Sequence, residues 1–133
     1  MKFKKVPQRQ RANFPGKYFN DCIFDVKVFN IADRMIKDYA GGHWDYIIFD
    51  ERVPFMCLNE NHQILINPFS NEEVQVPRLI AGMIVTSYAV MFQLERGCRS
   101  AEKLSDLHRI LNSEIYQQCK NIDREDIWMT LMD

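Results

Sequence analysis

Residues 39–46 read Tyr-Ala-Gly-Gly-His-Trp-Asp-Tyr, and they separate two segments with different periodicities. Upstream, between residues 23 and 36, apolar side chains recur mostly at spacings of three and four, which is typical of an amphipathic helix. Downstream, residues 44–49 are aromatic or β-branched except for one aspartate, which favours a strand. Gly41 and Gly42 stand where a helix C-terminus often needs a positive φ. The segment therefore predicts a helix, a tight glycine turn and a strand.

Farther along the chain, short strand-like runs alternate with polar turns. We expect an antiparallel meander formed by residues 44–49, 55–58, 63–66 and 73–76. Residues 78–96 are apolar on nearly all sides, which is typical of a helix in the centre of a core. Two more helices follow, and Asp123 is expected to cap the second, short one. The sequence thus predicts an α+β fold, with a small antiparallel β-meander of three or four strands packed against about four α-helices.

The chain of 133 residues suits one domain, but its charge is unevenly distributed. The formal net charge is −1, while the first 11 residues carry +5 and the remainder carries −6. We therefore expect residues 1–17 to form a basic, flexible arm and residues 18–133 to form a single folded domain. The arm either solubilises the chain or contacts a polyanion such as nucleic acid. Its basic residues are Lys2, Lys4, Lys5, Arg9 and Arg11.

The spacing of the cysteines and the hydropathy of the chain indicate the cellular compartment in which we expect the protein. None of the four cysteines forms a C-x-x-C pair, and no apolar segment follows the basic residues as in a secretory signal. We therefore expect reduced thiols and a cytoplasmic protein. The longest apolar run, residues 79–94, is interrupted by polar residues and is too short to span a bilayer, so no membrane partner is expected. The sequence leaves the oligomeric state open.

Several residues are candidates for catalysis or ligand binding. Phosphate-binding loops follow a strand and open a helix, whereas Gly41 and Gly42 follow a helix and open a strand, so we read the pair as a turn. Histidines and carboxylates lack the spacing of a zinc site or an acid–base pair. Cys57 and His62 lie on adjacent predicted strands and form an alternative nucleophile pair, although no third group orients the imidazole. We expect no catalytic residues, no metal ligands and no cofactor.

Aromatic side chains gather beside the predicted meander. Acidic residues between them oppose a phosphate backbone, which disfavours base stacking and leaves two readings, core packing or an exposed patch that docks a protein partner. In the docking hypothesis the glycines shape the turn, while His43 and Trp44 supply contact area. The candidate docking surface consists of Tyr39, Gly41, Gly42, His43, Trp44 and Asp45.

Several motifs, in this order, resemble the ArdB/KlcA antirestriction family. The first ones are Arg11-Ala12-Asn13-Phe14, Lys17-Tyr18-Phe19 and Asp38-Tyr39-Ala40-Gly41-Gly42-His43-Trp44-Asp45-Tyr46. The family carries a Y-x-G-G-x-W-x-[FY] core after a first helix, then a strand that residues 53–56 resemble and an A-G-I-V region that residues 81–85 resemble. The resemblance covers roughly residues 11–133. One departure is that Arg78, Leu79 and Ile80 stand where the family often has an acidic residue.

The resemblance implies a small cytoplasmic protein, encoded on a phage, plasmid or other mobile element, that relieves restriction by host type I restriction–modification enzymes. It implies binding to a protein of the host defence machinery and no enzymatic activity. Composition independently argues against DNA mimicry, since a duplex presents a negative charge about every 1.7 Å of axis. A net charge of −1 cannot supply that density. The alternative that we keep is a nucleic-acid-binding accessory protein that uses the basic arm.

Overall fold

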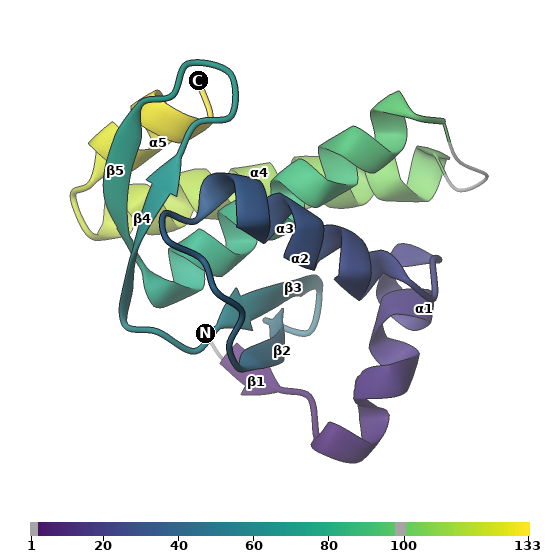
Figure 1. Ribbon diagram of the computed structural model, residues 1–133. Coiled ribbons are helices and arrows are strands. Elements are labelled where there is room, and N and C mark those ends of the chain that lie inside the picture. The colour runs from purple at the N-terminus through teal and green to yellow at the C-terminus, as the bar shows by residue number, and fades with distance from the viewer. Residues whose placement is uncertain (1–2, 98–100) are drawn as a thin grey trace.

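The computed structural model describes residues 3–97 and 101–133 and has the α+β fold that the sequence predicts (Figure 1). Helices predominate, and the strands form two small antiparallel sheets. In chain order the elements are β1 (Phe3–Lys5), the 3-10 helix η1 (Gln8–Asn13), α1 (Phe14–Phe19), α2 (Phe24–Met35), β2 (Trp44–Phe49), β3 (Val53–Leu58), β4 (His62–Ile66), β5 (Glu73–Pro77), α3 (Arg78–Glu95), α4 (Ala101–Asn121) and α5 (Glu125–Leu131).

Helix α3 is the centre of the molecule, as its apolar composition predicts. It lies against α4 along much of its length, and α2 crosses it on the viewer's side (Figure 1). Every residue from Ile80 to Val90 is buried, including Thr86 and Ser87. The hydroxyl of Thr86 accepts a hydrogen bond from the Met56 N–H at 3.1 Å, so the helix also lies along the outer edge of β3. This position satisfies strand-edge groups that would otherwise be buried without a partner.

The pairing of the strands differs from the expected meander. Strands β2 and β3 pair as expected, with Trp44 opposite Leu58 and Phe49 opposite Val53, but β4 pairs with β5 in a separate sheet. The free edge of β3 is covered by α3, so it has no room for β4. In addition, the Gln63 side chain donates to the Leu58 carbonyl at 3.2 Å, which uses an acceptor at the end of β3.

The expectation of a flexible arm over residues 1–17 was wrong for its described part. Residues 3–5 form β1 and pair antiparallel with β2, while α1 packs beside the sheet (Figure 1). Apolar side chains hold this segment against the domain. The centre of the Phe3 ring lies 4.5 Å from that of Phe49, Val6 is buried, and Phe14 is 1% exposed. Lys2 lies outside the described residues.

Gly82 allows α3 to approach β3 closely, and its replacement by alanine is expected to be destabilising. An added Cβ would lie 2.6 Å from the Met56 carbonyl oxygen and 2.9 Å from the Cys57 Cα, both backbone atoms that cannot move independently. Overpacking of this kind costs about 1–3 kcal/mol of unfolding free energy. Chemical denaturation of Gly82→Ala would measure it. Gly16→Ala is the matched control, since Gly16 is also helical and an added Cβ there meets nothing within 4 Å.

Candidate functional site

The glycine pair lies at the end of the connection between α2 and β2. Contrary to the prediction from the sequence, it does not terminate the helix, because α2 ends at Met35 and its capping residue Ile36 is already extended. Gly41 has φ of +84° and Gly42 has φ of +140°, values that side chains with a Cβ rarely adopt. Both glycines and His43 are exposed. The His43 carbonyl accepts a hydrogen bond from the Asn59 N–H at 2.8 Å, which joins the turn to the end of β3. This segment therefore presents backbone groups and an imidazole at the surface.

Trp44 does not supply contact area, contrary to the docking hypothesis. The side chain is 6% exposed, and its ring lies 5.5 Å from that of Phe29. Its indole N–H donates to the hydroxyl of the half-buried Tyr39 at 3.0 Å. As the first residue of β2, Trp44 points inward and joins α2 to the sheet. The exposed part of the expected surface is thus reduced to Gly41, Gly42 and His43, with Tyr39 at its margin.

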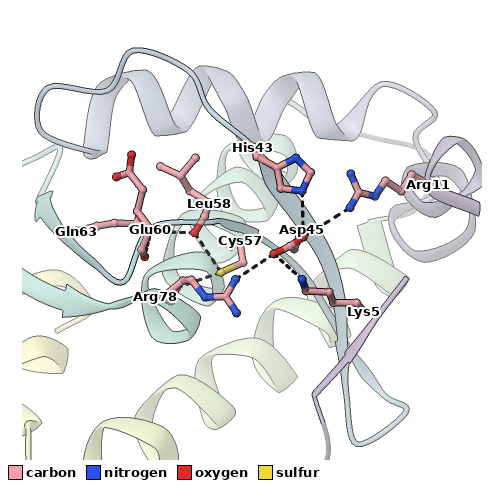
Figure 2. Close-up of polar contacts among 9 residues, drawn as sticks. All are labelled: Lys5, Arg11, His43, Asp45, Cys57, Leu58, Glu60, Gln63 and Arg78. Carbon is pink, nitrogen blue, oxygen red and sulfur yellow. Dashed lines mark hydrogen bonds and ion pairs between the residues drawn. The ribbon is translucent and has the colours of Figure 1, made fainter. Parts of the chain in front are cut away.

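Asp45 is also buried, and it lies at the centre of a group of cationic side chains (Figure 2). The carboxylate is 1% exposed. Oδ2 accepts a hydrogen bond from Arg78 Nη1 at 3.0 Å and lies 3.6 Å from Lys5 Nζ. Oδ1 lies 3.6 Å from Arg11 Nη2 and 3.4 Å from His43 Nε2. We call these five residues, Lys5, Arg11, His43, Asp45 and Arg78, the Asp45 cluster.

The members of the Asp45 cluster come from four segments of the chain. Lys5 ends β1, Arg11 lies in η1, and Arg78 is the first residue of α3. His43 directly precedes β2, which carries Asp45 itself. The cluster therefore connects the N-terminal segment, the glycine turn and the central helix across one carboxylate. A buried charge needs such partners, because desolvation without them is costly.

The Asp45 cluster carries an excess of positive charge. In the contacts that the structure describes, Lys5, Arg11 and Arg78 share this single carboxylate, and all three are cationic at neutral pH. Their exposure differs. The side chains of Lys5 and His43 are 64% and 61% exposed, whereas those of Arg11 and Arg78 are 25% and 26% exposed. The two arginines thus form the inner part of the cluster, and Lys5 and His43 form its outer part.

The ring of Tyr46 lies against Arg11, in the inner part of the cluster. The Arg11 guanidinium lies 5.4 Å from the centre of the Tyr46 ring, within the range of a cation–π contact. The Tyr46 hydroxyl donates to Asp25 Oδ2 of α2 at 3.0 Å. Burial, followed by this hydrogen bond, raises the pKa of Tyr46 to about 12. Tyr46 is therefore neutral at physiological pH and serves as a fixed platform for Arg11.

The structure brings together two sets of residues that the sequence treated as alternatives. Lys5 and Arg11 came from the nucleic-acid set, and His43 and Asp45 came from the protein-docking set. Two further basic residues of the nucleic-acid set, Lys4 and Arg9, are not part of the Asp45 cluster. Both are exposed, and neither forms an ion pair with Asp45 in the described contacts. Sequence reasoning missed Arg78 as a site residue, because it lies 33 positions from Asp45. Its only signal was that it stands where the resembled family often has an acid.

The alternative nucleophile pair finds no support in the geometry. Cys57 is fully buried, and its thiol lies 3.3 Å from the Arg78 carbonyl oxygen, to which it donates. Burial raises the pKa of Cys57 to about 12, so the reactive thiolate is scarce. His62 is exposed at the start of β4. Within residues 3–97 and 101–133, no group of three or more His, Cys, Asp or Glu side chains is placed to hold a metal ion.

In the native protein we expect the rate at which each cysteine thiol is labelled to depend on its burial. Cys22 is exposed, whereas Cys57 and Cys119 are buried, and burial raises the pKa of Cys119 to about 11. At mildly alkaline pH we expect iodoacetamide to modify Cys22 quickly and to reach Cys57 and Cys119 only after unfolding. Peptide mass spectrometry would give the rate for each residue. Fast labelling of Cys57 in the folded protein would restore it as a candidate nucleophile. Cys98 lies outside the described residues.

Comparison with protein-family models and with curated proteins finds no match to this chain. The resemblance to the antirestriction family therefore stays an expectation that rests on the motifs themselves. None of the helices within the described residues combines the length and apolar character that crossing a bilayer requires.

Proposed function

We propose that the chain is a non-enzymatic antirestriction protein that acts in the host cytoplasm. In this proposal it relieves type I restriction by binding a protein component of the defence machinery. One support is the place of the resembled motifs in the fold. The Y-x-G-G-x-W-x-[FY] segment follows α2 and enters β2, and the Ala81-Gly82 region lies at the contact between α3 and β3. Each motif thus occupies a position where its glycines or aromatic rings have a structural role.

The observation that carries the proposal is the exposed turn beside the Asp45 cluster. Gly41, Gly42 and His43 are exposed, and the His43 ring lies next to the cationic side chains (Figure 2). Such a surface offers backbone groups, an imidazole and positive charge from elements held in fixed positions. Asp45 holds the Arg78 guanidinium through a hydrogen bond of 3.0 Å, and a group that is held in place before binding loses little conformational entropy on binding.

The same surface argues against DNA mimicry as the mechanism. A mimic must present a dense row of negative charges to a DNA-binding enzyme. Here the cluster is positive on balance, and the whole chain has a net charge of only −1. The proposed partner is therefore engaged through a surface that does not compete as a substitute duplex.

Plating of unmodified phage on a host with an active type I system tests the proposal. Expression of the wild-type chain is expected to raise the efficiency of plating towards that of phage already modified by the same host. The modified phage is the control for effects on infection that do not involve restriction. An unchanged efficiency of plating, with the chain expressed and folded, would contradict the proposal.

A second candidate function, nucleic-acid binding, is favoured by one observation, the exposed cationic side chains of the N-terminal segment, Lys4, Lys5 and Arg9. Deletion of residues 1–11 is not a suitable test, because β1 is part of the sheet. Replacement of the exposed Lys4 and Arg9 by glutamine removes two charges and leaves the paired residues in place. Electrostatic binding would appear as a gel shift that weakens steeply with salt and in this double variant. The absence of a shift at low salt would exclude this function.

A further inference from the structure

The outer edge of β1 is a row of main-chain groups that other described residues do not pair. β1 is the outermost strand of its sheet and pairs with β2 on one side only (Figure 1). The Val6 N–H donates to the Tyr46 carbonyl at 2.7 Å. Antiparallel alternation therefore directs the N–H and carbonyl groups of Lys4 toward β2 and those of Phe3 and Lys5 away from it. Such an edge is a template for a further strand.

A pocket opens beside this edge, between the sheet and α1. Its volume is about 330 Å³, within the range of about 300–1,000 Å³ that is typical of ligand pockets. Val6 follows β1 directly and Ile48 is paired with Lys4, so the pocket lies on the face of the sheet to which the Lys4 side chain points. The lining is apolar on one side and polar on the other, and consists of Val6, Phe14, Tyr18 and Ile48 with Gln10, Asn13 and Lys17.

The edge and the pocket match two parts of one ligand, an extended peptide. Successive side chains of a strand point to opposite faces, so a strand added to β1 would place every second side chain on the face that carries the pocket. In strand addition the main-chain hydrogen bonds supply affinity, and pockets for alternate side chains supply specificity. The rings of Phe14 and Tyr18 lie 5.0 Å apart in the pocket lining, which suits an aromatic or aliphatic side chain.

The lysines of β1 indicate which chain the added strand comes from. Antiparallel pairing of residues 3–5 with the same residues of a second copy would place Lys4 opposite Lys4, and like charges directly opposite each other are destabilising. Lysine on an edge strand is a common protection against pairing between copies. A strand of another protein with acidic or neutral side chains carries no such penalty. The edge of β1 thus discriminates against a second copy of this chain.

We propose that the edge of β1 and the adjacent pocket form a docking site for an extended segment of the partner protein, which adds a strand to the sheet and places one apolar side chain in the pocket. This inference rests on the proposed function, in which the partner is a protein. The Lys5 N–H would donate to a carbonyl of the segment, and the Lys5 carbonyl would accept an N–H from it. The opposite edge of the sheet, on β3, is covered by α3, so β1 is the edge that can be extended.

Titration of the purified chain with the peptide acetyl-Val-Glu-Phe-Glu-Val-amide tests this inference. Its phenylalanine can enter the pocket while its glutamates lie on the other face, beside Lys5. In the free chain we expect the Lys5 amide proton to exchange quickly with solvent, because it points away from β2, and the Lys4 amide proton to exchange slowly. The peptide is expected to slow exchange at Lys5 and to shift the amide resonances of the pocket lining. The same peptide with every amide N-methylated lacks donors and is expected to change neither.

Two matched pairs of variants separate the edge from the pocket. Lys5→Pro removes the outward N–H, a change that edge strands tolerate, whereas Lys5→Gln removes the same charge and keeps the N–H. We expect the Kd for the peptide to be about fivefold higher in Lys5→Pro than in Lys5→Gln, as the loss of one hydrogen bond predicts. Ile48→Ala removes part of the pocket lining and is expected to raise the Kd about fivefold. Ile64→Ala, at an exposed position of β4 in the other sheet, is expected to leave it unchanged.

Any of four outcomes would overturn the docking site. The first is exchange at Lys5 that the peptide does not slow, and the second is an equal Kd for Ile48→Ala and Ile64→Ala. The third is an equal Kd for Lys5→Pro and Lys5→Gln; if Lys5→Pro does not fold, the first two measurements decide. The fourth is a dimer in sedimentation whose Lys5 amides are protected without peptide, which would assign the edge to a second copy. These experiments need only the purified chain, so their failure is distinct from a failure to relieve restriction, which the plating assay reports in cells.

Discussion

Replacement of Asp45 by asparagine is expected to destabilise the fold by about 3 kcal/mol, because it leaves a group of cations without its carboxylate. Asparagine has nearly the same shape, so the loss reports charge rather than packing. The removal of one partner from a buried ion pair costs about 3–5 kcal/mol. We take the lower end of that range, because Arg11 and Arg78 remain about one quarter exposed and are partly solvated. Urea denaturation followed by circular dichroism would measure the change.

Asp126→Asn is the matched control for this prediction. Asp126 is also paired with an arginine, Arg124, at 2.8 Å, but both side chains are substantially exposed, at 55% for Asp126 and 39% for Arg124. Exposed pairs contribute about 0–1 kcal/mol, so this variant is expected to be nearly as stable as the wild type. Adding Lys5→Gln to Asp45→Asn is expected to restore part of the lost stability, since it removes one of the like charges. Equal costs for Asp45→Asn and Asp126→Asn would contradict the central role of the carboxylate.

Replacement of Trp44 by alanine is expected to destabilise the fold by about 3–5 kcal/mol, the range for a large aromatic side chain in a core. The substitution opens a cavity between α2 and β2 beside Phe29 and removes the donor to the Tyr39 hydroxyl. Small domains have only about 5–15 kcal/mol of stability in total. A loss of restriction relief in this variant would therefore reflect unfolding and not a lost contact.

The second tryptophan of the chain provides the comparison. Trp128 is half-buried on α5, where its ring packs edge-on against Tyr116 at 5.2 Å. We expect Trp128→Ala to cost clearly less than Trp44→Ala in the same denaturation experiment. If Trp44→Ala cost less than about 1 kcal/mol, Trp44 would not be a core residue, and the original docking hypothesis for its side chain would return.

Much of the fold could be predicted because local patterns determine it. The three-and-four spacing before the glycine pair gives α2, and the residues with an aromatic or β-branched side chain after it give β2. The continuous apolar composition of α3 predicted its central place. The pairing of β4 could not be predicted, since it depends on Thr86 covering the edge of β3 from 30 positions away. Turn signals alone cannot report such a long-range contact.

The candidate site was predicted only in pieces, for a similar reason. Charge runs and motifs identified Lys5, Arg11 and Asp45 separately, and no local pattern indicated that they meet. The β1–β2 pairing brings Lys5 near Asp45, and the start of α3 adds Arg78. The burial of Trp44 and Asp45 was open in the sequence, because successive residues of a strand point to opposite faces and both faces of β2 are covered.

Capture of host proteins by immobilised chain, followed by mass spectrometry, tests the central claim that a defence protein binds at the exposed surface beside the Asp45 cluster. The baits are the wild type, Lys5→Gln/His43→Gln and, as the control, Lys120→Gln at an exposed position of α4, each confirmed as folded, in lysate of a host with an active type I system. We expect a subunit of the restriction–modification enzyme with the wild type and with Lys120→Gln, and a much reduced amount with the double variant. Equal capture by all three baits, or capture of no restriction–modification subunit by the wild type, would contradict the claim.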